Sequence, residues 1–327
     1  MREHRTVRVD RASSVVEHPV DEHSAERSLE PGGRRVTSLH EHSGAAPGSP
    51  EIRWFSAGSR GPAVLLVMGL GMRGELWRPQ VEGLRGAHRL AWFDHRGVGE
   101  SGPTPSRRLH MREMARDALR VADALALEAR AAGDLSGAWE RFHLVGVSMG
   151  GMVAQELALR APGRVRSLTL IATFGGGPLH GRLPTAEGLR AFVAANVARE
   201  PGARVRALQS LLYPPEYLAA ADREALSARM RAQLTGRVPP RTLLGQLHAV
   251  FRHDALARLP SLDLPTLVVR PGRDVLVRPT HSDALLARLP NARHLALPDA
   301  GHGVIFQRAR EVNAAIASLV QDVERSA

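Results

Sequence analysis

The chain has 327 residues, 43% of them apolar, enough for one large domain or two ordinary ones, and its lack of cysteine excludes disulfides, thiolate metal sites and cysteine nucleophiles. The formal net charge is +11, but all 44 basic residues are arginines scattered along the chain, and aromatic residues make up only 4%. Because nucleic-acid surfaces usually gather basic residues on one face with stacking aromatics, a solvated arginine-rich surface is favoured over a nucleic-acid partner.

The first 33 residues are charged and lack apolar periodicity, so we predict a disordered N-terminal extension over 1–33. The five histidines that precede residue 43 have spacings that match no compact metal-ligand pattern, and no metal site is expected. The N-terminus has no apolar stretch typical of a secretory signal, and no run of eighteen apolar residues occurs. These features predict a cytoplasmic protein that does not span a membrane.

From about residue 34, short apolar runs alternate with helical patterns along the chain. Strands are predicted at 51–58, 63–69, 87–94, 142–147, 164–173, 265–270 and 292–298. Helices are predicted at 75–86, 110–131 and 151–161, and as a closing helix that carries Val304, Val312, Ile316 and Leu319. Nearly continuous apolar strands that alternate with helices indicate a mostly parallel sheet covered on both faces.

The stretch 175–262 breaks this alternation, because it contains helical, partly apolar segments and no strand candidate. We predict a helical cap inserted over one edge of the sheet, so that 34–174 and 263–327 form the core. The cap residues Phe192, Leu211, Leu212, Tyr213 and Tyr217 suggest an apolar pocket, although any docked helix needs an apolar face.

The sequence GVSMG at 146–150 follows a predicted strand and precedes a predicted helix. One interpretation is an ordinary turn between the two elements. The other is a nucleophile elbow, in which glycines permit a sharp, strained turn that lifts the Ser148 hydroxyl above the carboxyl ends of the strands. The placement between strand and helix favours Ser148 as a nucleophile.

A serine hydroxyl needs a histidine base that is oriented by a carboxylate. His302 and Asp274 each lie on a loop after a predicted strand, and the chain order Ser148, Asp274, His302 is the one expected for this architecture. We therefore predict these residues as a catalytic triad. Asp299 is a rival acid, but it precedes His302 by only three residues, a poor position from which to orient that ring.

A tetrahedral oxyanion would need two backbone donors. We predict the N–H groups of Met149, which follows the nucleophile, and of Leu70, in the glycine-rich segment 68–72. The alternative for 68–72 is an ordinary tight turn. Asp94 and Arg96, in the segment DHRGVGESG, are expected to shape the site without taking part in the chemistry.

These segments together resemble the α/β-hydrolase family over residues 34–325. VLLVMGLGMRGELW resembles the family's oxyanion segment, LVGVSMGGMVAQ its nucleophile elbow, and PGRDVLV and LPDAGHGVIF its acid and base loops. The resemblance implies an α/β-hydrolase fold with a mostly parallel sheet of about eight strands, flanking helices and a helical cap. One departure is Met68-Gly69, where many members carry His-Gly; because the donor is a backbone N–H, the oxyanion hole should survive.

The resemblance implies a serine hydrolase for a small to medium apolar ester or lactone, with no metal or organic cofactor. An enol-lactonase, a cofactor-free haloperoxidase or perhydrolase, a thioesterase and a carbon–carbon hydrolase remain alternatives on the same triad. A ligand receptor that keeps the fold is a further alternative outside enzymes. The sequence gives no indication of the oligomeric state.

Overall fold

The computed structural model describes residues 39–104, 107–177, 183–233 and 238–326. Residues Leu39–Ala327 form one compact unit. The predicted disordered extension over 1–33 lies outside the described residues, as does most of the segment 34–39 in which order was expected to begin.

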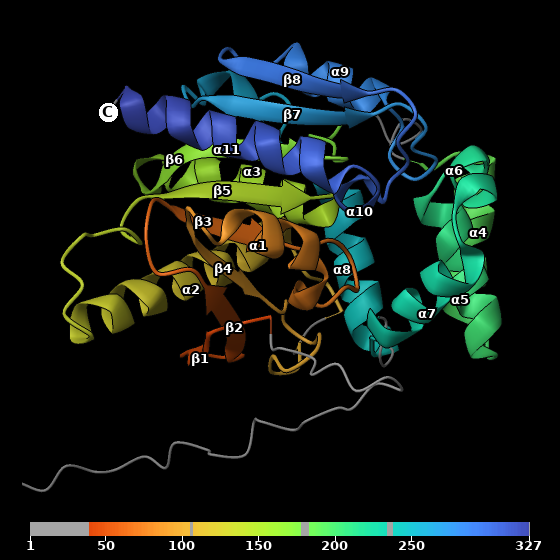
Figure 1. Cartoon of the computed structure of the whole chain (residues 1–327), viewed down its shortest axis with the longest axis horizontal. Coiled ribbons are helices and arrows are strands. Elements are labelled where there is room, and N and C mark those ends of the chain that lie inside the picture. Colours follow the sequence, from red (N-terminus) through yellow and green to blue (C-terminus); the bar gives the residue numbers. More distant parts are fainter. Residues whose placement is uncertain (1–38, 105–106, 178–182, 234–237, 327) are drawn as a thin grey trace, which may run out of the picture. The chain divides into compact units, whose positions relative to one another are not determined.

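A single eight-stranded sheet runs through this unit in the order β1-β2-β4-β3-β5-β6-β7-β8 (Figure 1). Its strands are β1 (His42–Ala46), β2 (Ile52–Ala57), β3 (Ala63–Val67), β4 (Arg89–Phe93), β5 (Phe142–Val147), β6 (Val165–Ile171), β7 (Thr266–Pro271) and β8 (Ala292–Leu297). Strands β1, β2 and β4 pair antiparallel, and every pair from β4 to β8 is parallel. The predicted mostly parallel sheet of about eight strands is confirmed.

Helices cover both faces of the sheet. The helical elements that flank it are η1 (Gly74–Trp77), α1 (Arg78–Leu84), α2 (Met111–Ala131), α3 (Met149–Arg160), η2 (Pro162–Arg164), η4 (Leu259–Ser261), α9 (Thr280–Leu286), α10 (Val304–Gln307) and α11 (Ala309–Arg325). Within β3, Leu65 and Val67 belong to the apolar cluster that includes α2 and α3, whereas Val64 and Leu66 belong to the cluster that includes α1 and α11. Since both faces of β3 are buried, its sequence is apolar throughout instead of alternating.

Strand β1 was not predicted from the sequence. Its residues, HSGAA, are polar or small, and the first two are exposed at the edge of the sheet. A strand that buries little side-chain surface lacks the apolar pattern on which sequence prediction depends. Antiparallel pairing with the next strand along the chain, β2, defines β1, with a register that runs from Ala46–Ile52 to His42–Ser56.

The closing helix is interrupted at its beginning. Arg308 has φ −128° and ψ 43°, which separates the short α10 from α11. The apolar residues of α11 that were predicted to face the core, Val312, Ile316 and Leu319, are all buried. Periodicity therefore identified the buried face of the helix but not the break in its backbone.

Helices without an intervening strand fill the described residues between 183 and 252. They are α4 (Ala186–Val197), α5 (Pro201–Leu212), α6 (Pro215–Ala220), α7 (Arg223–Gln233) and α8 (Pro240–Arg252). In Figure 1, the arrowheads of β5 and β7 point toward the side on which α4–α6 lie. Because Leu39–Ala327 is one compact unit, the division into a core and a cap over 175–262 stays a prediction.

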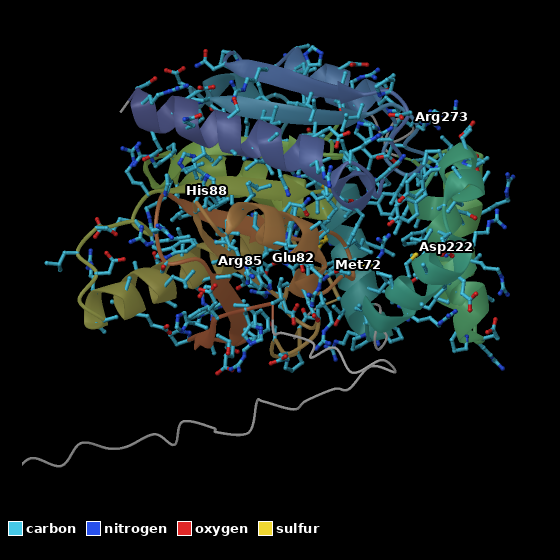
Figure 2. The ribbon with its side chains drawn as sticks, in the orientation of Figure 1. Met72, Glu82, Arg85, His88, Asp222 and Arg273 are labelled. Atoms are coloured by element: carbon cyan, nitrogen blue, oxygen red, sulfur yellow. The ribbon has the colours of Figure 1, made fainter. Side chains whose placement is uncertain are left out.

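Apolar contacts join this helical segment to the sheet. Val205, Leu208 and Leu211 belong to a separate buried cluster in α4–α7. Met72 packs against both that cluster and the cluster of α1 and α11, and Figure 2 shows it between the helical segment and the sheet body. The loop after β3, which carries the predicted oxyanion donor, is thus in contact with both groups of elements.

The buried side chain of His143 makes the free energy of unfolding depend on pH. His143 on β5 contacts Ser167 Oγ at 2.7 Å and Glu324 Oε1 at 3.0 Å, and burial lowers its pKa from 6.5 to about 4. The unfolded chain therefore binds a proton near pH 6.5 that the folded chain binds only near pH 4. The contribution of His143 to the free energy of unfolding should be fully present above pH 6.5 and fall by about 3 kcal/mol between there and pH 4.

Urea unfolding of wild type and His143→Gln from pH 4 to 7.5 tests this expectation. The slope of the variant should be smaller by the contribution of His143, whereas His294→Gln, at an exposed position of β8, should keep the wild-type slope. Equal slopes for wild type and His143→Gln would contradict the assignment.

Candidate active site

Ser148 connects β5 to α3 in a strained conformation. Its φ of 54° and ψ of −124° place it among the two non-glycine residues with positive φ in the described chain. The backbone is fixed there because Ser148 N donates to Ile171 O at 2.9 Å, and Ser148 O accepts from Thr173 Oγ1 at 2.7 Å. Strain of this kind persists only where surrounding contacts hold it, and it is concentrated at functional sites.

The flanking glycines are required by close backbone approach. A Cβ atom on Gly146 would overlap the Gly150 carbonyl oxygen, and one on Gly150 would overlap the Val67 carbonyl oxygen. Both glycines thus let α3 begin directly against β3 and β5. This tight strand–turn–helix geometry fits the predicted nucleophile elbow, and the role of Ser148 as a nucleophile stays a prediction.

His302 and Asp274 lie in direct contact. His302 Nδ1 is 2.7 Å from Asp274 Oδ2, and both side chains are buried. The other carboxylate oxygen, Oδ1, accepts the N–H groups of Leu276 and Val277, each at 2.8 Å. With Oδ1 held by two amides, Oδ2 is left to orient the ring, so that Nε2 is the nitrogen available for proton transfer.

The three predicted triad residues follow parallel strands. Ser148 follows β5, Asp274 follows β7 and His302 follows β8. Because parallel strands carry their carboxyl ends to one edge of a sheet, the three residues lie at the same edge, where ligands bind in such sheets.

Asp299, the rival acid, points elsewhere. Its side chain is exposed and pairs with Arg308, and its backbone carbonyl accepts Gln307 Nε2 at 3.0 Å. It therefore stabilises the start of the final helical segment and makes no contact with His302 among the hydrogen bonds of the described residues.

The segment 68–72 lies against the serine. A Cβ on Gly69 would be 3.3 Å from Ser148 Cβ and 3.8 Å from its Oγ. Among the described residues, the amides of Leu70 and Met149 donate to no protein acceptor. Met149 N–H also stands at the N-terminus of α3, where the helix dipole favours negative charge. Two backbone donors beside the hydroxyl can stabilise an oxyanion.

Two buried side chains that contact this segment were not singled out from the sequence. His95 Nε2 is 2.8 Å from Met68 O, and Gln246 Oε1 accepts Gly71 N–H at 2.8 Å. Burial lowers the pKa of His95, so the ring is neutral at pH 7, and the carbonyl partner requires that Nε2 carry the proton. No local sequence signal could have found these contacts, because Gln246 lies 175 residues from Gly71.

Asp94 and Arg96 make contacts within the fold. Asp94 Oδ1 accepts Gly74 N–H at 2.7 Å and Oδ2 accepts Glu100 N–H at 3.0 Å, while burial raises its pKa. Arg96 forms a buried bidentate pair with Asp117 at 2.6 and 2.8 Å. These interactions fix the loop after β4, on which His95 lies.

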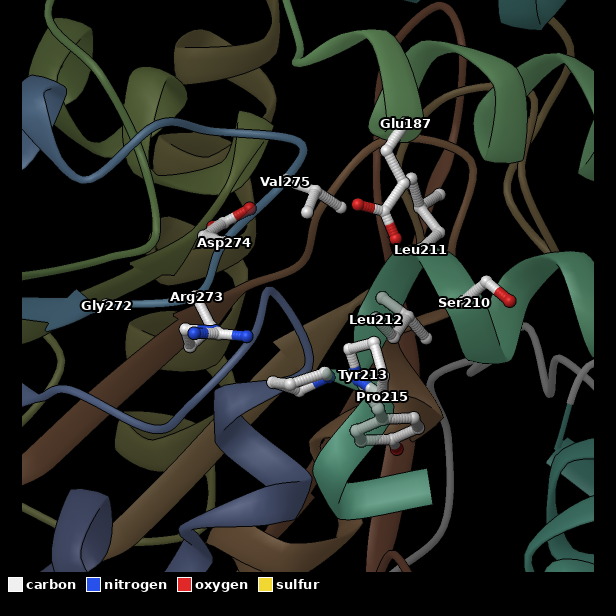
Figure 3. A pocket seen from close by; sticks show the side chains of 11 residues that line it. Glu187, Ser210, Leu211, Leu212, Tyr213, Pro215, Gly272, Arg273, Asp274 and Val275 are labelled. Atoms are coloured by element: carbon white, nitrogen blue, oxygen red, sulfur yellow. The ribbon is translucent and has the colours of Figure 1, made fainter. Parts of the chain in front are cut away.

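A cavity of about 320 Å³ opens between the acid loop and α4–α6 (Figure 3). Its walls are formed by Glu187, Ser210, Leu211, Leu212, Tyr213, Pro214, Pro215, Gly272, Arg273, Asp274 and Val275.

The described residues contain no group of three or more His, Asp or Glu side chains arranged to hold a metal ion. None of the described helices is long and apolar enough to cross a lipid bilayer.

The elbow geometry predicts a strong effect of Gly150→Ala. The added methyl group would overlap Val67 O, which cannot move without distorting β3, so the free energy of unfolding should fall by about 3 kcal/mol or more. Gly86→Ala is the matched control, since no atom lies within 4 Å of its Cβ position. Thermal unfolding of both variants measures the difference, and equal stability would show that the close approach at Gly150 is wrong.

Comparison with known proteins agrees with this geometry. Residues 62–309 match the family described as the alpha/beta hydrolase fold. A protein assigned as a carbamate hydrolase, RutD of Azorhizobium caulinodans, is 34% identical over 250 residues, which cover 76% of this chain and 87% of that protein.

Two solved structures are similar in both sequence and fold. A thermophilic esterase from Thermogutta terrifontis has 26% identity and a TM-score of 0.68, covering 86% of this chain and 99% of its own. A protein assigned as a non-heme bromoperoxidase, BpoC of Mycobacterium tuberculosis, has 28% identity and a TM-score of 0.68, covering 83% and 96%. With its sheet order, its elbow and the family match over most of its length, the chain belongs to the α/β-hydrolase family and is a hydrolase.

Proposed function

We propose that the protein cleaves a carboxylic ester or lactone of a small to medium apolar substrate, with Ser148 as nucleophile, His302 as base and Asp274 as the orienting acid. The observation that carries this proposal is the buried 2.7 Å contact between His302 Nδ1 and Asp274 Oδ2, at the sheet edge that also presents the strained Ser148. The comparisons support acyl chemistry, since similar proteins are named as a carbamate hydrolase and an esterase.

In the proposed reaction, one group transfers protons and the others stabilise the charges that form. His302 Nε2 takes the Ser148 proton as Oγ attacks the carbonyl carbon, and Asp274 stabilises the imidazolium that forms. The amides of Leu70 and Met149 hold the tetrahedral oxyanion. His302 then protonates the leaving alkoxide, and it next activates the water that releases the carboxylic acid from the acyl-enzyme.

A cavity borders the proposed site at Asp274, and neither Ser148 nor His302 is among its lining residues. A volume of about 320 Å³ is at the lower end of the range for small-molecule sites. Leu211, Leu212 and Tyr213 give part of its wall an apolar character, whereas Glu187 and Arg273 add charge. We propose that this cavity takes part of the substrate, and on that basis we expect short to medium acyl chains to react fastest.

Perhydrolysis is the second candidate, favoured by the 28% identity to a protein assigned as a bromoperoxidase. Here hydrogen peroxide would replace water in the second half-reaction and release a peracid. Assays with hydrogen peroxide and a short carboxylic acid separate the two candidates, because an ester hydrolase without this activity releases no peracid. Enol-lactones and carbon–carbon substrates become the next tests if all simple esters are inert.

Steady-state and burst hydrolysis of nitrophenyl esters with graded acyl length tests the nucleophile. Ser148→Ala should lower kcat/KM by several orders of magnitude, because no other group can form the acyl-enzyme. The acyl length with the highest kcat/KM would report the pocket size. An unchanged rate in Ser148→Ala, or no turnover of any ester by wild type, would overturn the proposal.

The choice of acid is tested by a pair of aspartate variants. Asp274→Asn should lower kcat by about 10³- to 10⁴-fold, because the amide cannot stabilise the imidazolium or hold its tautomer. Asp299→Asn should keep kcat within about 3-fold, since Asp299 is exposed and pairs with Arg308. The reverse ranking of kcat in the two variants would identify Asp299 as the acid.

A further inference from the structure

We propose that His95 and Gln246 are positioning residues that clamp the segment Met68–Met72 from two sides and so fix the Leu70 N–H for the oxyanion. The proposal rests on the proposed function of Ser148 and Leu70. It assigns to two buried side chains, one of them on helix α8, a role in transition-state stabilisation without contact to the substrate.

The segment provides little internal support of its own. Its turn bond, from Met72 N to Gly69 O, is 3.4 Å long, near the limit of a useful hydrogen bond. Gly71 has a φ of 68°, a conformation that glycine adopts without steric cost. A loop with a weak turn bond and a glycine at its tip needs external contacts to keep one geometry.

Those contacts flank Leu70. Before it, Met68 O accepts the His95 Nε2–H at 2.8 Å, and after it Gly71 N–H donates to Gln246 Oε1 at 2.8 Å. His95 is 1% exposed and Gln246 is 0% exposed, so water does not compete for either bond. His95 therefore holds the Met68–Gly69 peptide and Gln246 holds the Leu70–Gly71 peptide. The peptide that carries the Leu70 N–H, Gly69–Leu70, lies between these two held groups.

Helix α8 brings Gln246 to this position. Thr242 lies one turn earlier on the same face, and it fills the space where a side chain at Gly97 would be. Gly97 belongs to the same loop as His95. Helix α8, the loop after β4 and the segment Met68–Met72 thus form one packed unit.

An unsatisfied donor shows that Gln246 is not placed for packing alone. With Oε1 committed to Gly71, the buried Nε2 of Gln246 has no hydrogen-bond partner in the part of the chain that the structure describes. An orphaned buried N–H₂ group destabilises the fold, and a methionine of similar length would avoid it. What the Gln246 amide supplies here, and a methionine would not, is an oxygen that accepts the Gly71 N–H.

Two methionine variants, each with a matched control, test the clamp. Gln246→Met and His95→Met remove the two bonds. Gln209→Met and His88→Met remove buried side chains of the same types, which bond to Ser227 Oγ and Leu84 O, away from the segment. His95→Gln restores a donor at about the reach of Nε2 and is the rescue variant. Nitrophenyl ester kinetics, thermal unfolding and binding of a short alkylboronic acid are measured for each.

The clamp predicts a loss confined to the transition state. Gln246→Met and His95→Met should lower kcat by about 10- to 100-fold with KM within about 3-fold, and weaken boronate binding by a similar factor. Binding of the product carboxylic acid should not change. The double variant should lose less than the product of the single losses, because both act on one peptide segment. The controls and His95→Gln should stay near wild-type kcat.

Several results would overturn the clamp. One is an unchanged kcat and boronate affinity in both methionine variants, and another is a rise in KM alone. A third is an activity loss that is seen only near the unfolding temperature of the variant and disappears well below it. A failure of the proposed function looks different, because wild type itself would then neither hydrolyse the ester nor bind the boronate.

Discussion

The left-handed backbone at Ser148 is the constraint on which the site depends. Ser148 keeps a φ of 54° because its backbone is bonded to Ile171 and Thr173, at a point where β3, β5 and α3 meet so closely that neither Gly146 nor Gly150 has room for a side chain. The same close approach sets Gly69 against the serine and starts α3 at Met149. One packing arrangement thus leaves Ser148 partly exposed, with the start of α3 and the segment at Gly69 directly beside it.

The acid and base loops are also tied to the helical segment. Gly303 N–H donates to Leu212 O at 2.7 Å, at the end of α5, and Arg273 pairs with Glu216 at 2.7 Å. Since these bonds lie next to His302 and Asp274 in the chain, the loops that carry these two residues are bonded directly to the helices that border the cavity. Burial of His302 and Asp274 in the same region strengthens their electrostatic interaction by lowering the local dielectric constant.

Much of this arrangement could be predicted from the sequence, because apolar strands and the GVSMG elbow are local signals. The strand predicted at 142–147 coincides with β5, and the helix predicted at 110–131 differs from α2 by one residue. Local patterns failed where side chains carry no apolar signal and where long-range contacts decide the structure. The polar edge strand β1 is of the first kind, since only its backbone pairing with β2 defines it, and Gln246, which reaches Gly71 through the packing of α8, is of the second. The roles of Ser148, Asp274, His302, Leu70 and Met149 stay predictions, although the structure gives each a fitting geometry.

The most direct test of the account is to identify the residue that becomes acylated. The enzyme would be quenched during turnover of a nitrophenyl ester, and its mass and peptide map would be determined. The account predicts one acyl group per chain, on the peptide that contains Ser148, and none in Ser148→Ala. Turnover without an acyl adduct, or an adduct on another residue, would contradict it.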